Sequence, residues 1–303
     1  MPKVSICIPA YNQPEYLKKT IDSVLRQTFT DYEIVITDDS PGTVVSDLIA
    51  GYNLQHQLKY FKNTSTLGSP ENWNESIRKA SGEYIKILHH DDWLNFDDSL
   101  AKYVSLLDDN PEVDFAFSAT RAIDPKGGDW MHGIASEELQ LLKENPLILC
   151  NNNLVGAPST TIFRRNTELK FDCNLKWHVD IENYIRQISK NNTLAYSPES
   201  LVVTFIAEGR VSDECIGNRE VEVFEYFYLF DKVTRSKFNY KAKALKGCML
   251  RAIAICNNYK IERVQDIRNC GYDGDIHPSI KNWIFLNQFS SLFGKLYLKF
   301  LRS

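Results

Sequence analysis

Short apolar runs alternate with amphipathic segments along the first 118 residues. Five runs are rich in β-branched or aromatic side chains and are predicted to be buried strands: 4–8, 33–37, 58–62, 83–88 and 115–118. Four intervening segments repeat apolar side chains every three or four residues, as helices do: 14–25, 44–52, 70–80 and 98–107. This alternation predicts an α/β protein with a doubly wound, mostly parallel sheet.

The pattern changes in the second half of the chain. Residues 124–212 contain short extended pieces such as Ser159–Arg165 and one helical segment near 178–190. From about residue 218 the apolar spacing is helical throughout, which predicts a helical C-terminal extension. We therefore expect three parts: 1–118, 119–217 and 218–303.

Polar side chains follow three of the predicted strands. These clusters are Ala10-Tyr11-Asn12, Asp38-Asp39-Ser40 and His89-His90-Asp91-Asp92. In doubly wound sheets, ligands bind outside the carboxyl ends of the strands. We therefore expect the three clusters to meet at one edge of the sheet and to form a binding site.

The adjacent carboxylates of Asp91 and Asp92 repel each other and resist burial. Two interpretations fit this pair. It is a solvated turn that caps the next helix, or it holds a cation that offsets the repulsion. Carboxylate oxygens are ligands that suit Mg²⁺ or Mn²⁺.

Composition narrows the class of protein. The chain has 303 residues and is 43% hydrophobic, enough for a sizeable core, and its net charge of −4 argues against a nucleic-acid partner. Its seven cysteines are scattered without a C-x-x-C pair, as reduced thiols are in a cytosolic protein. We find no signal-peptide pattern and no apolar run approaching about 18 residues. We therefore expect a cytoplasmic protein.

Four stretches carry a family resemblance. "VSICIPAYNQPEYLKKTIDSVLRQTFTDYEIVITDDS" resembles the opening of the family 2 inverting glycosyltransferases, which have a GT-A fold. "LGSPENWNESIRKASGEYIKILHHDD" is similar to their next motif, with Gly68, Asn74 and Gly82 at the family's spacing. "HVDIENYIR" resembles their acceptor-side helix, and "EGRVS" resembles their closing loop. The resemblance covers roughly residues 1–212.

The resemblance implies transfer of a sugar from a UDP-sugar donor to a hydroxyl of a glycan or polyprenyl-linked acceptor. It assigns residues 1–118 to the nucleotide-sugar half of a GT-A domain and 119–217 to the acceptor half. It also implies Mn²⁺ or Mg²⁺ as the metal, and polysaccharide assembly such as O-antigen or capsule synthesis as the setting.

The resemblance assigns the metal to Asp92, and it assigns Asp91 to the ribose or to a metal-bound water. The family segment begins with another aspartate where this chain has His89. That difference leaves His89 open as a metal ligand, as a donor to phosphate, or as neither.

Five residues are expected to hold the nucleoside. By resemblance Asp39 binds the base or ribose and Asp38 supports it, although Asp-Ser-Pro-Gly is also a good turn. Tyr11 is expected to stack on the uracil, with the backbone of Pro9, Ala10 and Tyr11 along the base edge. A core or lid tyrosine is the alternative for Tyr11.

Three further residues are assigned to the diphosphate and the acceptor. Asn74 is expected near the diphosphate, or as a surface amide, and Arg210 as a diphosphate clamp, or as a surface arginine. Asp180 matches the family's general base; it also stands where a helix N-cap would stand. Glu182 is the fallback base.

The C-terminal tail is basic and amphipathic. Residues 276–303 contain no acidic side chain, and apolar residues recur there at helical spacing. This pattern predicts a peripheral contact with the inner face of the cell membrane. A helix packed on its own domain and an oligomer contact are the alternatives.

Two other functions compete with glycosyl transfer. A sugar nucleotidyltransferase needs a glycine-rich phosphate loop after the first strand, and "PAYNQPEY" stands there without a glycine. A non-catalytic protein that binds nucleotide sugars or glycans would keep the same binding residues but show no turnover.

Overall fold

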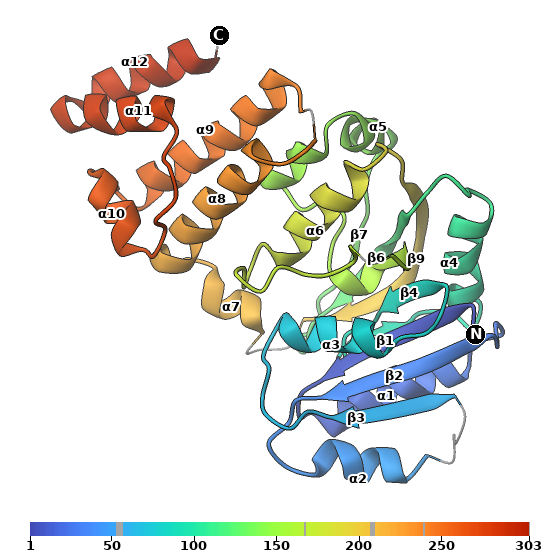
Figure 1. Ribbon diagram of the computed structural model, residues 1–303. Helices are drawn as coiled ribbons and strands as arrows, with labels where there is room; N and C mark the ends of the chain where they lie inside the picture. The colour runs from blue at the N-terminus through green and yellow to red at the C-terminus, as the bar shows by residue number, and fades with distance from the viewer. Residues whose placement is uncertain (53–56, 167, 207–209, 239, 303) are drawn as a thin grey trace.

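The computed structural model describes residues 1–303 except 53–56, 167, 207–209, 239 and 303. The described residues form one mixed sheet with helices on both faces (Figure 1). The strands are β1 (Val4–Ala10), β2 (Tyr32–Asp38), β3 (Leu58–Lys62), β4 (Tyr84–Ile87), β5 (Trp93–Leu94), β6 (Phe115–Ile123), β7 (Asp129–His132), β8 (Thr161–Arg164) and β9 (Ala195–Phe205). The α-helices are α1 (Pro14–Leu25), α2 (Val44–Ala50), α3 (Glu71–Lys79), α4 (Ser99–Asp108), α5 (Ser136–Glu144), α6 (Val179–Ile188), α7 (Val211–Cys215), α8 (Arg219–Thr234), α9 (Ala242–Asn258), α10 (Val264–Asn269), α11 (Pro278–Phe289) and α12 (Ser291–Arg302).

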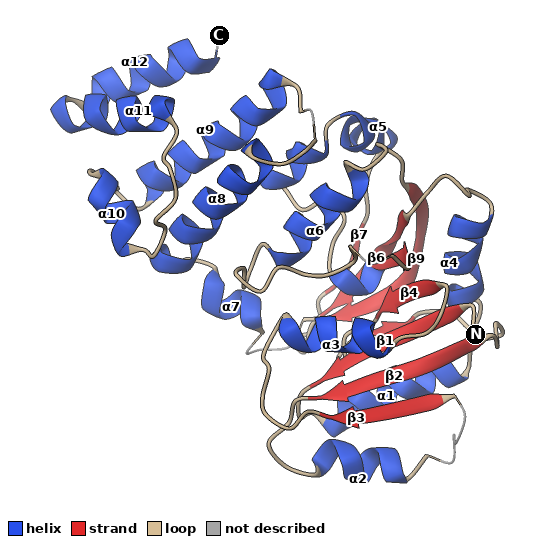
Figure 2. Cartoon of the chain, in the orientation of Figure 1, coloured by secondary structure: helices blue, strands red, loops and turns tan. Residues whose placement is uncertain are grey.

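The sheet has the strand order β3-β2-β1-β4-β8-β6-β9-β5, and β7 pairs with β6 (Figure 2). β3, β2, β1 and β4 are mutually parallel, as the strand–helix alternation predicted. β8 lies between β4 and β6 and is antiparallel to both. The first half of the sheet therefore aligns the carboxyl ends of β1, β2 and β4 along one edge.

Alternate side chains of β1 enter two separate cores, which confirms that the sheet is covered on both faces. Ile6 and Ile8 are fully buried against Leu17 and Ile21 of α1. Cys7, one position out of phase, is buried in the other core together with residues of α6, α8, α9 and α11. Strand pleating explains this division, because successive side chains point to opposite faces.

Several elements of the middle part were not predicted. β6 continues to Ile123 beyond the predicted end at residue 118, and β9 is eleven residues long although its start reads "AYSPES". The polar start of β9 lies near a break in its register with β6, around Ser118 and Ala119. A bulge of this kind interrupts the alternation from which a strand is predicted.

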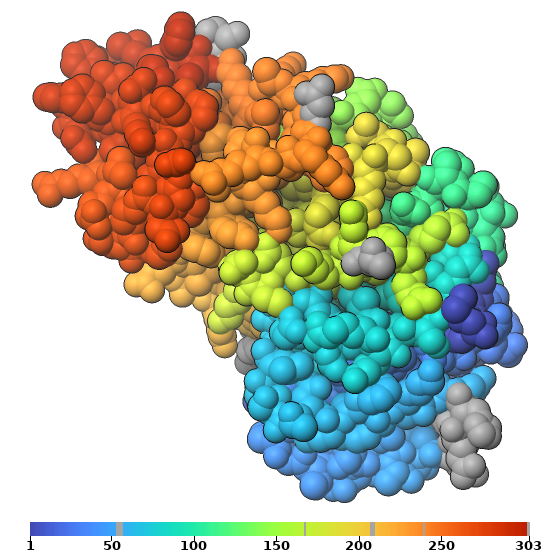
Figure 3. Space-filling view, viewed as in Figure 1, coloured from blue at the N-terminus to red at the C-terminus, as the bar shows by residue number. Residues whose placement is uncertain are grey.

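The helical C-terminal extension is confirmed. α8 to α12 continue the core that begins under the sheet, and that core runs from Cys7 to Ile284. α11 and α12 form the end of the molecule farthest from β3 (Figures 1 and 3). The three-part division stays a prediction. Among the described helices, none combines the length and the apolar character needed to cross a membrane.

Candidate active site

Three turns at the ends of β1, β2 and β4 bond directly to one another. The Asp39 backbone N–H donates to the Ala10 carbonyl over 2.9 Å, and the Asn12 N–H donates to Ser40 Oγ over 2.7 Å. The His90 ring nitrogen Nδ1 lies 3.3 Å from the Pro9 carbonyl oxygen. The predicted convergence of the three polar clusters is therefore confirmed.

A cleft of about 980 Å³ opens at this edge of the sheet. Eight of the ten predicted site residues line it: Pro9, Ala10, Tyr11, Asp39, Asp91, Asp92, Asp180 and Arg210. They come from five separate stretches of the chain. Tyr11 leaves 49% of its surface exposed at the cleft, so its ring is free to meet a ligand.

Asp38 and Asn74 do not belong to this lining. The Asp38 carboxylate is fully buried and accepts hydrogen bonds from Tyr60 Oη and Lys62 Nζ. The Asn74 amide accepts from the Phe171 N–H over 2.7 Å and donates to the Phe171 carbonyl over 2.9 Å. Asn74 therefore joins α3 to a distant loop, and Asp38 holds the end of β3. Their roles toward the diphosphate and the nucleoside stay predictions.

Asp39 fixes the loop that forms one wall of the cleft. Its carboxylate accepts from the backbone N–H groups of Leu67 and Gly68 over 2.8 and 2.7 Å, and from Asn63 Nδ2 over 2.9 Å. Gly68 has φ +75°, a conformation that favours glycine. Asp39 is only 4% exposed, but it belongs to the residues that line the cleft.

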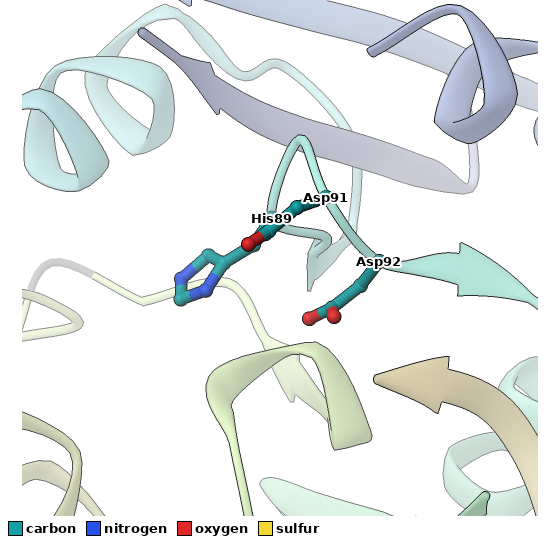
Figure 4. A group of neighbouring side chains, drawn as sticks. All are labelled: His89, Asp91 and Asp92. Carbon is teal, nitrogen blue, oxygen red and sulfur yellow. The ribbon is translucent and has the colours of Figure 1, made fainter. Parts of the chain in front are cut away.

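His89, Asp91 and Asp92 form a compact group on the turn between β4 and β5. One potential ligand atom from each lies within 4.8 Å of the others. The His89 ring and the Asp92 carboxylate leave this turn toward the same side (Figure 4). Trp73 of α3 packs on the His89 ring, with 4.7 Å between ring centroids, and holds its orientation.

The electrostatics of this group suit a divalent cation. Burial lowers the pKa of His89 to about 4, so its imidazole is neutral at pH 7 and offers a lone pair. His89 Nε2 is buried without a hydrogen-bond partner. Burial, reinforced by the Asp91 carboxylate, raises the pKa of Asp92. One imidazole nitrogen and two carboxylates are a donor set that accepts Mn²⁺ or Mg²⁺, and a cation would offset the clustered negative charge.

Asp180 is the second residue of α6, and the N-cap position belongs to His178. Its carboxylate accepts from Asn153 Nδ2 over 3.1 Å and from the Ile181 N–H over 2.8 Å. Burial raises the pKa of Asp180 to about 6. The fallback base Glu182 lies outside the cleft lining, 3.0 Å from Arg186 Nε and 3.0 Å from Lys232 Nζ.

A match to a sequence model identifies the family of this chain. The sequence model described as "Glycosyl transferase family 2" matches residues 5–168, more than half of the chain. The chain belongs to glycosyl transferase family 2. The matched region includes nearly all of β1, β2 to β8, the turns that follow β1 and β2, and the His89–Asp92 group. The resemblance stated from the motifs is thereby confirmed, together with the GT-A type of fold.

The sequence matches to relatives of this family 2 chain cover only part of each relative's length. An "uncharacterized glycosyltransferase MJ1057" of Methanocaldococcus jannaschii is 29% identical over 194 residues, 63% of this chain and 66% of the relative. A "GalNAc(5)-diNAcBac-PP-undecaprenol beta-1,3-glucosyltransferase" of Campylobacter jejuni is 36% identical over 98 residues, 31% of each chain. The matched segments thus span less than two thirds of these relatives.

Solved structures share the fold at low identity. S. aureus TarS 1-349 in complex with UDP-GlcNAc superimposes with a TM-score of 0.62 at 15% identity, covering 94% of this chain and 79% of TarS. The mannosyltransferase PcManGT from Pyrobaculum calidifontis, in complex with GDP-Man and Mn²⁺, gives 0.59 at 14% identity, covering 97% and 86%. At this identity the likeness establishes the fold alone.

The family 2 cleft contains residues that the motifs did not indicate. Asn153 orients Asp180, and Tyr226 and Arg251 line the cleft from α8 and α9. Arg251 Nε and Nη2 donate to Tyr226 Oη over 3.2 and 3.0 Å. The run Asn151-Asn152-Asn153 was a usable signal for a polar loop. Nothing in the local sequence marks Tyr226 or Arg251, because both stand in amphipathic helices beyond the matched region.

The predicted closing loop is described only in part, since Glu208 and Gly209 of "EGRVS" lie outside the described residues. Arg210 lines the cleft beside α7, and its Nη2 lies 3.1 Å from Asp213 Oδ1. Its Nε is buried without a hydrogen-bond partner, so this guanidinium has a donor left for a ligand.

Proposed function

We propose that this family 2 protein is a metal-dependent, inverting glycosyltransferase that moves a sugar from a UDP-sugar to a hydroxyl of a glycan or lipid-linked acceptor. One observation carries the proposal. A single cleft holds the nucleoside-side turn of Asp39, the His89–Asp92 group and the half-buried carboxylate of Asp180. These are the three parts that sugar transfer from a nucleotide requires.

On the donor side, Tyr11 offers an exposed ring to stack on the base, and the backbone of Pro9 and Ala10 lies along the base edge. Asp39 holds the loop of Gly68 against the ribose. Residues 1–118 form the donor half in this proposal and 119–217 the acceptor half. The complexes of the structural neighbours with UDP-GlcNAc and GDP-Man support a nucleotide sugar as donor.

The leaving diphosphate carries concentrated negative charge. His89, Asp91 and Asp92 are the residues that would hold Mn²⁺ or Mg²⁺, and a cation there supplies Lewis-acid stabilisation of that charge. Arg210 brings a guanidinium to the same cleft and donates to a phosphate oxygen as the α7 side closes over the donor.

On the acceptor side, Asp180 accepts the proton of the attacking hydroxyl. Asn153 and the Ile181 N–H each donate to one of its carboxylate oxygens and fix its position in the cleft lining. Attack from the side opposite the diphosphate inverts the anomeric centre, and an α-linked donor gives a β product. Trp177, His178 and Tyr226 form an aromatic wall, with 4.3 Å between the first two rings, on which a sugar face can pack.

The setting we propose is polysaccharide assembly, such as O-antigen or capsule synthesis, on the cytoplasmic face of the cell membrane. The name of the Campylobacter jejuni relative, which describes an undecaprenol-diphosphate acceptor, supports a lipid-linked acceptor. The two competing functions predict other results. A nucleotidyltransferase would release diphosphate from a sugar phosphate and UTP, and a binding protein would release nothing.

The function is tested with a panel of nucleotide sugars in the presence of Mn²⁺. We expect one UDP-sugar to raise the melting temperature and to yield free UDP once a glycan or lipid-linked acceptor is added. EDTA should abolish the release, and Mn²⁺ or Mg²⁺ should restore it. Thermal stabilisation without any UDP release over the full acceptor panel would favour the non-catalytic protein.

The pH dependence tests the base separately. Because burial raises the pKa of Asp180 to about 6, we expect kcat/KM to rise about tenfold per pH unit below pH 6 and to level off above it. The measurement is a profile from pH 4.5 to 8 at saturating metal. The residual activity of Asp180→Asn should lack this inflection, and an inflection that persists in the variant would assign it to another group.

A further inference from the structure

The outer surface of the last two helices is apolar and exposed. Five large side chains of α11 and α12 leave between 51% and 69% of their surface to solvent: Phe285, Phe289, Leu292, Phe293 and Leu296. We call this surface the C-terminal apolar face. The Phe285 and Phe289 rings contact each other, with 4.9 Å between centroids. Exposed apolar side chains that gather on two packed helices mark a site of association.

The same two helices are also apolar on their inner side. Ile280, Trp283 and Ile284 of α11 are buried in the main core. Leu298 and Leu301 of α12 pack against that core. The inner side chains therefore anchor the helices to the protein, and folding of the chain leaves the C-terminal apolar face uncovered. A helix that is apolar on both sides is expected to bury both.

The charges on these two helices have one sign. Lys281, Lys295 and Lys299 are exposed on the same two helices. Residues 276–303 contain no aspartate or glutamate, while the chain as a whole carries −4. The lysines thus give α11 and α12, which lie at one end of the molecule (Figure 1), a net positive charge.

We propose that the C-terminal apolar face docks on a lipid bilayer that contains anionic headgroups. The apolar side chains enter the boundary between headgroups and acyl chains, and the lysines contact the headgroup phosphates. The charge argues against a second copy of this chain as the occupant, because two copies would bring like charges together across an apolar contact. This docking goes beyond the proposed glycosyl transfer and does not depend on it.

The test is sedimentation of the full chain with vesicles, without donor or acceptor. We expect binding to phosphatidylcholine vesicles with a quarter phosphatidylglycerol, weaker binding at high salt, and little binding to pure phosphatidylcholine. The double variant Phe289→Ser and Phe293→Ser should bind at least about tenfold less. The double variant Lys295→Glu and Lys299→Glu should lose the preference for anionic vesicles.

Two matched controls lie elsewhere on the surface. Met131→Ser removes an apolar side chain of β7 that is 57% exposed, and Lys170→Glu reverses an exposed lysine. Both should bind vesicles as the unmodified chain does. The proposal is overturned if the unmodified chain does not bind anionic vesicles. It is overturned as well if the double variant Phe289→Ser and Phe293→Ser binds them as strongly as the unmodified chain does. It is also overturned if light scattering shows a dimer that this variant splits.

Discussion

Asp180→Asn is expected to lower turnover by at least about 10²-fold while leaving the binding of UDP-sugar unchanged. The amide keeps the size of the side chain, and its single carbonyl oxygen keeps the hydrogen bond from Asn153 Nδ2, while the bond from the Ile181 N–H is lost. What the variant loses is the ability to take a proton from the acceptor hydroxyl. Single-turnover rates and donor affinity from calorimetry, measured on the same preparation, separate the two effects.

The stability of Asp180→Asn provides an internal check on the site. The folded-state pKa of about 6 lies above the ordinary value of 3.8, so folding favours the protonated carboxyl and the ionised form lowers stability as pH rises through 6. The amide removes that cost, and the variant should be more stable than the parent at pH 7.5, by roughly 1–3 kcal/mol. The gain should vanish near pH 4. Melting curves at both pH values measure it.

A control for this variant is available on the same helix. Glu182→Gln removes a carboxylate that is ion-paired with Arg186 and Lys232 outside the cleft lining. It should lower the melting temperature yet keep turnover near normal below that temperature. If Asp180→Asn retained normal rates and Glu182→Gln lost them, the base would have to be reassigned.

Asp92→Asn is expected to abolish metal-dependent transfer, with a loss of about two to four powers of ten. The amide oxygen still accepts from the Phe205 N–H, so the turn between β4 and β5 keeps its hydrogen bond. The variant removes one of the two carboxylates, Asp91 and Asp92, that lie beside His89 in the candidate metal site. The parent should gain thermal stability from Mn²⁺, and the variant should gain little.

Asp97→Asn is the matched control for this prediction. It makes the same chemical change five residues further along, on an exposed carboxylate that lies 3.4 Å from Arg26 Nε and outside the cleft lining. Its thermal stabilisation by Mn²⁺ and its turnover should equal those of the parent. Undiminished transfer by Asp92→Asn at low Mn²⁺ would refute Asp92 as a metal ligand.

Much of the structure of residues 1–118 was predictable from short-range pattern. β1, β2 and β4 are apolar runs that end in polar turns, and parallel pairing places such turns together whatever the details of packing. Asn74 shows what short-range pattern leaves out. Its position in the motif suggests a ligand contact, but its amide is satisfied by the backbone of Phe171, almost a hundred residues away. No local pattern encodes that contact.

The sequence by itself determined the family, the parallel half of the sheet, the acidic turn of Asp91 and Asp92, and the helix that carries Asp180. These features depend on residue order over short distances, on strand and helix periodicity, and on motif spacing. Only the tertiary structure decided that α8 and α9 bring Tyr226 and Arg251 to the cleft, and that Asn153 orients Asp180. It also decided which side of α11 and α12 faces solvent. Those outcomes depend on how distant helices pack, and packing selects among faces that are equally apolar in the sequence.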